Sequence, residues 1–433
     1  MTHEENGSGC CSTNGHKPTV KIDVKLDDLM GDVNLRKKRA QIETRRAQSV
    51  SEPSKIVYMV GVDVGSTTVK AVAVDLESDQ ILWQDYQRHD TKQPEKTLEF
   101  LKRMESEVGI APNNTRMFIT GSGGASIAPL LGAKFVQEVT AVSLAVEKLH
   151  PEVNSVIELG GQDAKIIVFK EDENTGRKKK IPSMNDKCAG GTGAVIDKIN
   201  AKLKIPPDLL CDQGYHNIKL HPVAGKCGVF AETDINGLQK QGIPPDQLMA
   251  SLFDAIVLQN LSVLTRGHTM RPHVLLLGGP NSFIRGMKEA WQHNIPKTWE
   301  ERKVPIPEGA KPEDLIKVPG NAQYFAAIGA VEFGKDEEEE VGRYRGTESL
   351  VEYIEVGRAE EKAQSGGQGL NTSEEELTDF KKQYTINCVY IKARHALAFD
   401  RWLEKHSVAL GDLDVILLAR HFRLQGEHLG TIL

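Results

Sequence analysis

Two short segments of the chain share one pattern, in which an apolar strand ends in an acidic residue and a glycine-containing turn leads into a second strand. The first segment is VGVDVGSTTVKAVAVD, around Asp63 and Gly65, and the second is IELGGQDAKIIVF, around Glu158 and Gly160. Glycine permits the positive backbone angles of a tight turn, and successive N–H groups in such a turn can surround phosphate oxygens. Each segment therefore predicts a β-hairpin whose tip can hold a phosphate group.

In the first hairpin we expect Asp63 to organise Mg²⁺, mainly through water, because Mg²⁺ keeps part of its hydration shell when it binds to proteins. The polar residues of the turn and a lysine just beyond it are expected to contact phosphates. These residues are Gly65, Ser66, Thr67, Thr68 and Lys70. One such hairpin is a weak signal by itself, since many purely structural hairpins contain Asp and Gly.

The second hairpin repeats this logic and again places an acidic residue, glycines and polar groups, including Gln162, at a turn between strands. The other candidate residues of this tip are Gly160, Gly161 and Asp163. A third glycine turn, Gly278–Gly279, follows the apolar strand HVLLL and precedes a predicted helix, so that an adenosine could approach the backbone there. The chain has neither a P-loop nor a G-x-G-x-x-G dinucleotide motif at a strand–helix junction.

Two phosphate hairpins followed by a strand, a Gly-Gly turn and a helix resemble the ATPase pattern shared by actin, Hsp70 and the sugar kinases. The resemblance implies an α/β fold of two lobes that bind ATP or ADP with Mg²⁺. The chain has 433 residues, which is long enough for two or three lobes. We predict a polar arm at 1–54, the ATPase domain at 55–335, and an acidic linker with a small C-terminal module at 336–433.

Composition narrows the possible partners. The net charge is −6, which gives no bulk electrostatic reason to bind nucleic acid or a membrane surface. No apolar run approaches the length of a membrane span, and the N-terminus lacks the basic and apolar blocks of a secretory signal, so a cytoplasmic protein is expected. In such a protein the six cysteines favour metal binding or packing over disulfides.

Two cysteines each precede a predicted helix by a few residues: Cys188 in NDKCAGGTGAVIDKI and Cys227 in KCGVFAETDINGL. The positive end of a helix stabilises a thiolate and, with it, an anionic iron–sulfur cluster. A cubane cluster takes about four thiolates, so two from each of two subunits is the simplest arrangement. Packing, reactive thiols and a shared zinc remain open on spacing alone. Gly191 and Thr192, after Cys188, are expected to support both this loop and the nucleotide.

The other cysteines carry less information. Cys211 lies in PDLLCDQG, without neighbouring glycines, and is expected to be a small buried residue. Cys388 lies in an apolar strand and is expected in a core, whereas Cys10 and Cys11 lie in the N-terminal arm. None of these four is a candidate cluster ligand.

Taken together, these motifs over about residues 56–334 resemble the BadF/BadG/BcrA/BcrD-type ATPase family, which includes activators of 2-hydroxyacyl-CoA dehydratases and ATPase subunits of benzoyl-CoA reductases. The resemblance implies an ATP-driven electron donor in which two ATPase subunits share one [4Fe-4S] cluster. Cys188 and Cys227 would be its ligands in this chain. ATP binding and hydrolysis would rearrange the dimer, and a low-potential electron would pass to a catalytic partner that binds the acyl-CoA.

The extensions at both ends favour the larger ATPase subunit of ATP-dependent benzoyl-CoA reductase, which acts in anaerobic aromatic degradation. In that case the partners would be a shorter homologous ATPase subunit, two catalytic subunits and a ferredoxin as electron donor. An activator of a 2-hydroxyacyl-CoA dehydratase is the first alternative. Glu158 departs from the aspartate that is common in such activators, which leaves its role open. A sugar or acyl kinase and a nucleotide-gated scaffold are more remote, since neither explains Cys188 and Cys227.

Overall fold

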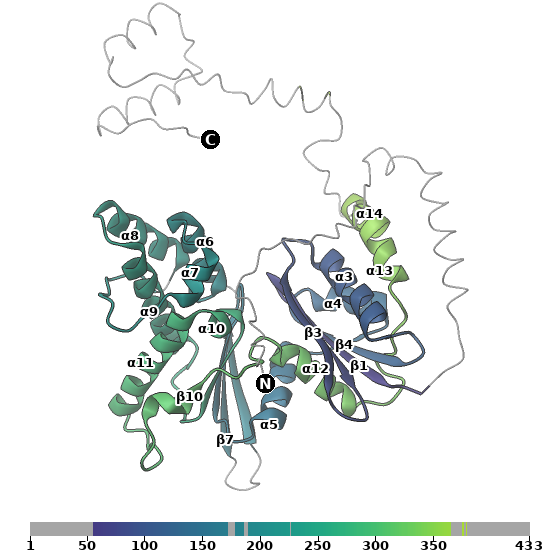
Figure 1. Ribbon diagram of the computed structural model, residues 1–433, viewed down its shortest axis with the longest axis horizontal. Coiled ribbons are helices and arrows are strands. Elements are labelled where there is room, and N and C mark those ends of the chain that lie inside the picture. The colour runs from purple at the N-terminus through teal and green to yellow at the C-terminus, as the bar shows by residue number, and fades with distance from the viewer. Residues whose placement is uncertain are drawn as a thin grey trace, which may run out of the picture. The chain divides into compact units, whose positions relative to one another are not determined.

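The computed structural model describes residues 55–171, 178–185, 189–225 and 227–364, with the single positions 375 and 378. These residues form two α/β lobes, each built on a five-stranded mixed sheet (Figure 1). This is the two-lobed α/β architecture that the sequence predicts. Within the part of the chain described here, no helix has both the length and the apolar character needed to cross a membrane.

The first sheet has the strand order β3-β2-β1-β4-β5. Its central strand β1 pairs antiparallel with β2 and parallel with β4, and six of its seven residues are buried. A strand covered on both faces has to be apolar almost throughout, which explains the continuous run YMVGVDV. The strands are β1 (Tyr58–Val64), β2 (Thr68–Asp75), β3 (Ile81–Arg88), β4 (Thr115–Thr120) and β5 (Lys134–Phe135).

The second sheet repeats this plan, with the strand order β10-β9-β6-β7-β8. Its central strand β6 pairs antiparallel with β7 and parallel with β9, as β1 does with β2 and β4. The β1–β2 and β6–β7 hairpins therefore hold equivalent places in the two lobes. The strands are β6 (Ser155–Leu159), β7 (Ala164–Glu171), β8 (Lys178–Asn185), β9 (Val274–Leu277) and β10 (Ile316–Lys317).

Helices α5 (Glu138–Leu149) and α12 (Phe325–Lys335) share one apolar core with residues from both sheets. Small residues allow this close packing. A Cβ atom on Gly329 would lie 1.7 Å from the carbonyl oxygen of Ala141 in α5, and a Cβ atom on Gly61 in β1 would lie 2.0 Å from the carbonyl oxygen of Ala327. The small-residue run AAIGA in α12 thus lets this helix contact a strand and a helix at once.

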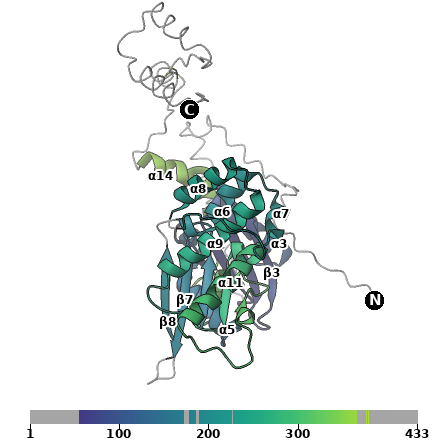
Figure 2. The same cartoon turned by 90° about the vertical axis from the view of Figure 1, so that its left-hand side faces the viewer.

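The other face of each sheet has its own helical layer and its own core. On the first sheet this core includes residues of α3, α4 and α13, and on the second sheet it includes residues of α6 to α9 and α11, which face the viewer in Figure 2. These helices are α3 (Gln93–Glu107), α4 (Gly124–Leu131), α6 (Gly193–Leu203), α7 (Pro207–Asp212), α8 (Gly228–Lys240), α9 (Pro245–Val263), α10 (Gly279–Phe283), α11 (Arg285–Glu301) and α13 (Glu348–Glu352).

The acidic run 336–340, predicted to begin a linker, packs on the first lobe. The buried Arg116 of β4 donates to the carbonyl oxygens of Val341, Glu338 and Glu337 at 2.8, 2.8 and 3.1 Å. The N–H of Met117 also donates to the carbonyl of Gly342. This segment lies along the part of β4 that does not pair with β5. The compact unit therefore extends to Glu360, within α14 (Arg358–Gln364), rather than ending at 335. The predicted N-terminal arm at 1–54 and most of the C-terminal module lie outside the described residues.

Candidate nucleotide site and cysteine loops

The first predicted hairpin forms as expected, with Ser66 and Thr67 at its two-residue tip. The N–H of Gly65 donates to the carbonyl of Thr68 at 2.9 Å and closes the turn. Asp63 faces Lys70 across the two strands, and the lysine Nζ donates to Asp63 Oδ2 at 2.7 Å. The tip residues and Lys70 line a cleft between the lobes.

Asp63 does not line this cleft directly. Its side chain is buried beneath Lys70, with the residue 1% exposed, and its Oδ1 atom has no hydrogen-bond partner. Burial, the largest single effect, disfavours the charge of Lys70, but the hydrogen bond to Asp63 and the combined attraction of Asp63, Tyr86 and Glu138 outweigh it and raise the pKa. Lys70 is therefore charged where it lines the cleft, while Asp63 has one buried carboxylate oxygen without a hydrogen-bond partner.

The second hairpin repeats the hydrogen bonding and strand pairing of the first. The N–H of Gly160 donates to the carbonyl of Asp163 at 2.9 Å, and Glu158 faces Lys165 across the strands as Asp63 faces Lys70. An acidic residue, a glycine two positions later and a lysine five positions after the glycine thus recur in both hairpins. This repeat is the sequence signal for Lys165, which was not among the predicted site residues.

Lys165 is the centre of a buried charge cluster. It is 1% exposed, and its Nζ lies 2.8 Å from Glu138 Oε1 and 3.5 Å from Glu158 Oε2, with an ion pair to Asp163 as well. Burial raises the pKa of Glu138 to about 8 despite the attraction of Lys165, and burial also raises the pKa of Glu158. Glu138 therefore holds a proton for much of the time at neutral pH.

Glu138 lines the cleft but was not predicted from the sequence. It is the first residue of α5, where an acidic side chain is ordinarily explained by its favourable interaction with the helix dipole. Only the packing of α5 against the second hairpin reveals its contact with Lys165. Three carboxyl groups around one lysine, beside the Asp63–Lys70 pair, supply oxygen atoms of the kind that Mg²⁺ prefers as ligands.

The tips of the two hairpins meet at the cleft. A Cβ atom on Gly161 would lie 2.2 Å from Thr67 Oγ1, so that only glycine fits there without displacement. Gly160, Gly161 and Asp163 line the cleft, whereas Gln162 is exposed and is not among the lining residues.

The start of α6 is bonded directly to the second hairpin. Thr192 Oγ1 donates to the carbonyl of Gly161 at 2.9 Å, and the N–H groups of Gly193 and Ala194 donate to the carbonyls of Gly160 and Gly161. Gly193 lines the cleft, while the predicted Gly191 and Thr192 lie behind the hairpin. These two residues therefore support the hairpin rather than line the cleft.

The third predicted turn lies between β9 and α10, with Gly278 and Gly279 both lining the cleft. Gly278 has φ +87°, and a Cβ atom there would lie 2.1 Å from the carbonyl oxygen of Leu159. The hydroxyl of Tyr86 from the first lobe reaches this turn, and its ring stands edge-on to Phe283 at a centroid distance of 5.3 Å. The three glycine turns predicted from the sequence are thus brought to one cleft.

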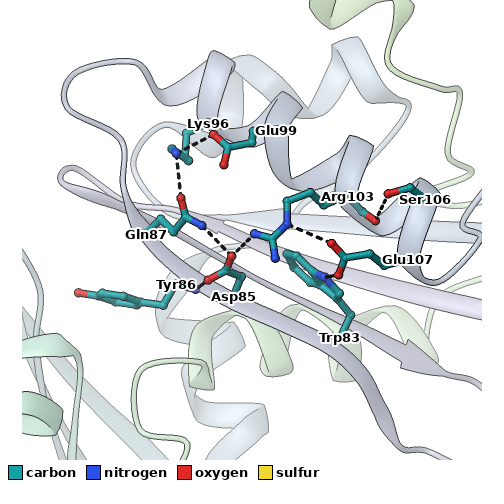
Figure 3. Close-up of polar contacts among 9 residues, drawn as sticks. All are labelled: Trp83, Asp85, Tyr86, Gln87, Lys96, Glu99, Arg103, Ser106 and Glu107. Carbon is teal, nitrogen blue, oxygen red and sulfur yellow. Dashed lines mark hydrogen bonds and ion pairs between the residues drawn. The ribbon is translucent and has the colours of Figure 1, made fainter. Parts of the chain in front are cut away.

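A polar network holds the β3 strand that carries Tyr86 (Figure 3). Arg103 of α3 forms ion pairs with Asp85 and Glu107 and stacks over Trp83, with 5.1 Å from its guanidinium carbon to the ring centroid. Trp83 Nε1 donates to Glu107 at 2.7 Å. Tyr86 points away from this network (Figure 3) and lines the cleft, so the network fixes β3 from the side opposite the nucleotide site.

One ion pair joins the two lobes at the cleft. Arg88, at the end of β3, contacts both carboxylate oxygens of Asp197 in α6, at 2.8 and 2.9 Å. Both side chains are exposed, at 58% and 41%, and both line the cleft. Neither was predicted from the sequence, because a charged pair so far apart along the chain has no local pattern.

Breaking this pair is expected to speed the release of ADP about fivefold or less, the range for one exposed ion pair. Arg88→Ala and Asp197→Ala should show it, and the double exchange Arg88→Asp with Asp197→Arg should restore slow release. Lys198→Ala is the control, since Lys198 pairs with Glu232 within the second lobe. Stopped-flow release of a fluorescent ADP measures the effect. If Lys198→Ala has an effect of equal size, or if the double exchange does not restore slow release, the Arg88–Asp197 ion pair does not hold the two lobes together.

Cys227 is the N-cap of α8 and is the free cysteine among the described residues. The backbone N–H groups of Phe230 and Val229 point at its sulfur and lower the pKa of the thiol. Gly228 lies against the other cysteine segment, since a Cβ atom on it would be 3.6 Å from Gly190 Cα. Cys188 itself lies outside the described residues. The residues around the two cysteines thus approach each other at the starts of α6 and α8.

Cys211 differs from its prediction in one respect. It is buried on α7, as expected, but it is disulfide-bonded, whereas the cysteine pattern was expected to favour metal binding or packing over disulfides. Among the described residues no group of three or more His, Cys, Asp or Glu side chains could hold a metal ion by itself.

Comparison with known proteins identifies the same region. The model of the BadF/BadG/BcrA/BcrD ATPase family matches residues 60–334. The (R)-2-hydroxyglutaryl-CoA dehydratase activating ATPase of Acidaminococcus fermentans is 25% identical over 63% of this chain and 95% of its own. A benzoyl-CoA reductase subunit of Thauera aromatica is 23% identical over 65% of this chain and 95% of its own.

Solved structures agree on the fold. The activator of 2-hydroxyisocaproyl-CoA dehydratase from Clostridium difficile, with bound ADPNP, has a TM-score of 0.51 and 23% sequence identity, covering 65% of this chain and 98% of its own. At that identity the likeness shows the actin/Hsp70/sugar-kinase fold and nothing finer, which confirms the predicted fold class. The family match, which spans more than half of the chain and all three glycine turns, shows that this protein belongs to the BadF/BadG/BcrA/BcrD ATPase family.

Proposed function

We propose that this chain is the ATP-hydrolysing, [4Fe-4S]-containing electron-donor subunit of a cytoplasmic benzoyl-CoA reductase complex. One observation carries the proposal. The second phosphate hairpin is hydrogen-bonded through Thr192, Gly193 and Ala194 to the start of the helix that follows the Cys188 segment. A change in the hairpin on ATP binding or hydrolysis therefore has a direct covalent and hydrogen-bonded route to one cysteine loop.

In the proposed nucleotide site, Lys70 and the N–H groups of the two hairpin tips hold the phosphates, and Asp63 and Glu158 organise Mg²⁺. Gly278 and Gly279 face the adenosine. Asp163 is a candidate for contacting the terminal phosphate from the second hairpin. Gln162 is a candidate for orienting the attacking water. Support for this arrangement comes from the cleft, which Lys70, Glu158, Asp163 and both glycine pairs line.

In the proposed cluster site, Cys227 and Cys188 are the ligands from this subunit. A bound [4Fe-4S] cluster would supply a one-electron carrier of low potential. The described residues fit it: Cys227 is free, its pKa is lowered by two backbone N–H groups, and Gly228 lies against Gly190 of the Cys188 loop. These N–H groups could also donate hydrogen bonds to the sulfur atoms of an anionic cluster.

The proposed partners are a shorter homologous ATPase subunit that completes the cluster, two catalytic subunits that bind the acyl-CoA, and a ferredoxin. The matched family region leaves the N-terminal arm and the C-terminal module unassigned, and we propose that they serve contacts within such a complex. A dehydratase activator is the second candidate, because the (R)-2-hydroxyglutaryl-CoA dehydratase activating ATPase matches with 25% identity, against 23% for the benzoyl-CoA reductase relative.

A reconstitution distinguishes the two candidates. The chain is purified without oxygen together with the shorter ATPase subunit and is mixed with ATP, reduced ferredoxin and either catalytic component. Reductive dearomatisation of benzoyl-CoA, dependent on this chain, supports the proposal. Dehydration of a 2-hydroxyacyl-CoA without dearomatisation would replace it with the activator.

Cys227→Ala is expected to remove the cluster. Loss of one thiolate ligand should abolish most of the bound iron and acid-labile sulfide and the EPR signal of the dithionite-reduced protein. Cys11→Ala, in the N-terminal arm, is the matched control and should keep both. ADP binding should persist in both variants, because Cys227 is not among the residues that line the cleft. A Cys227→Ala protein that retains its full iron content would refute the ligand assignment.

A further inference from the structure

The loop between the Cys188 segment and α6 is held by two different elements, the second phosphate hairpin and α9. On one side, Thr192 and the first turn of α6 donate to the carbonyls of the second phosphate hairpin. On the other side, the buried Asn260 of α9 donates through Nδ2 to the carbonyl of Gly191 at 2.9 Å. A Cβ atom on Gly191 would lie 2.9 Å from the same Nδ2 atom, so the loop packs directly against the Asn260 amide.

The neighbouring residue of α9 contacts both cysteine loops. In the amide orientation that satisfies both of its polar atoms, Gln259 donates to the carbonyl of Gly190 at 3.3 Å and also to the carbonyl of Gly225. Gly225 packs tightly on α9, since a Cβ atom there would lie 2.8 Å from the carbonyl oxygen of Ala255. Gln259 and Asn260, which we name the amide clamp, thus bind the Cys188 loop and the segment two residues before Cys227.

A continuous path follows from these contacts. It runs from the phosphate hairpin at Gly161 through Thr192 to Gly191, through the amide clamp to Gly225, and from there to Cys227. Asn260 is 1% exposed and Gln259 is 6% exposed, so the path lies within the protein, where displaced hydrogen bonds are not replaced by water. Movement at one end therefore displaces the other end or breaks a buried hydrogen bond.

We propose that the amide clamp is the positioning element that transmits nucleotide-dependent movement of the second phosphate hairpin to Cys227. This inference rests on the proposed function, because it assumes that nucleotide exchange moves the hairpin. It goes further in naming α9, which carries neither a cysteine candidate nor a residue that lines the nucleotide cleft, as the coupling helix. A purely structural clamp would satisfy the loop carbonyls equally well but would transmit nothing.

Hydrogen–deuterium exchange of the full-length, anaerobically purified, cluster-loaded chain tests the proposal. Exchange is measured with Mg²⁺ and either ADP or ADPNP, over segments 158–165 and 227–240. In the wild type, exchange of segment 227–240 should differ about fivefold between the two nucleotides, the lower range of allosteric coupling. In Asn260→Asp, which replaces the amide donor by an acceptor, that difference should vanish while the difference at 158–165 remains.

Gln259→Met keeps the side-chain length without the amide, so it gives a second reading if Asn260→Asp does not fold. Gln247→Glu is the control, because Gln247 lies on the same helix but contacts His221. Nucleotide affinity, by calorimetry, and iron content are measured for each sample. If the wild type binds no nucleotide or no iron, the proposed function fails, and this result is distinct from failure of the clamp. If a folded clamp variant that binds both nucleotides keeps the wild-type difference at 227–240, the inference is overturned. It is also overturned if the wild type, loaded with cluster and nucleotide, shows no difference.

Discussion

Asp63→Asn is expected to slow ATP hydrolysis about a hundredfold or more, the effect of removing one preorganised electrostatic group from a phosphoryl-transfer site. Asp63 is buried, carries an unpartnered Oδ1 and holds Lys70 at 2.7 Å. The substitution keeps the shape of the side chain but removes its charge. Both proposed duties, organising Mg²⁺ and keeping Lys70 in place, are then lost together. Steady-state phosphate release at saturating Mg·ATP measures the rate.

The matched control for this prediction is Asp75→Asn. Asp75 ends β2 at the opposite end of the same hairpin, where it accepts hydrogen bonds from Ser78. It is remote from the cleft, so its variant should hydrolyse ATP within about twofold of the wild-type rate. Hydrolysis by Asp63→Asn at the wild-type rate would show that the acidic residue of the first hairpin has only a structural role.

Lys165→Met is expected to lower the free energy of unfolding by about 3–5 kcal/mol at pH 7, as for other buried ion pairs that lose one partner. Lys165 is 1% exposed and is paired with Glu138 and Asp163, with Glu158 at 3.5 Å. Without the lysine, the buried Glu158 and the half-buried Glu138 and Asp163 remain close to one another, and desolvation already raises the pKa of Glu138 and Glu158. Urea unfolding of the nucleotide-free chain measures the loss.

The sign of the pH dependence follows from the same groups. When a carboxyl group has a higher pKa in the folded state than in the unfolded state, the free energy of unfolding falls as the pH rises between the two pKa values. Removing Lys165 raises the folded pKa values of Glu138 and Glu158 further, whereas the wild-type lysine stays charged because its own pKa is raised. The loss caused by Lys165→Met should therefore be larger at pH 8 than at pH 5.

Lys148→Met is the control for this comparison. Lys148 also contacts two carboxylates, Asp79 and Glu332, but its side chain is 37% exposed. Exposed ion pairs contribute about 0–1 kcal/mol, so this variant should lose far less stability. Equal losses in the two variants, or a Lys165→Met loss that is independent of pH, would argue against a buried charge cluster at the second hairpin.

Elements with a strong local pattern were predicted close to their observed positions. The strands around Asp63 and Glu158 and the strand before Gly278 are buried and apolar, and each runs into a glycine turn. The helices after Cys188 and Cys227 begin at Gly193 and Gly228, near the predicted positions. In each case the apolar period and the turn residue lie within a few positions of each other, so no distant part of the chain is needed to recognise them.

The strands at the sheet edges were not predicted, because they lack such a local apolar pattern. β8 has the sequence KKKIPSMN, in which three lysines and a proline leave no apolar pattern that would indicate a strand. β3 has the sequence ILWQDYQR, in which one residue of eight is buried. Strands at the edge of a sheet need no continuous apolar face, and polar or charged residues there discourage pairing with other chains. Their strand structure is decided by the neighbour that offers hydrogen bonds, which is β7 or β2.

The sequence by itself determined the three glycine turns, the order in which they occur and the family to which the chain belongs, because backbone requirements at a turn restrict residue type locally. Only the tertiary structure showed that Glu138 joins Lys165, that Arg88 joins Asp197 and that Asn260 holds the loop at Gly191. Each of these contacts connects residues that lie on different elements and far apart in the sequence. In the sequence, a helix residue that makes such a contact cannot be told from one that does not. Only the packing of the elements shows the difference.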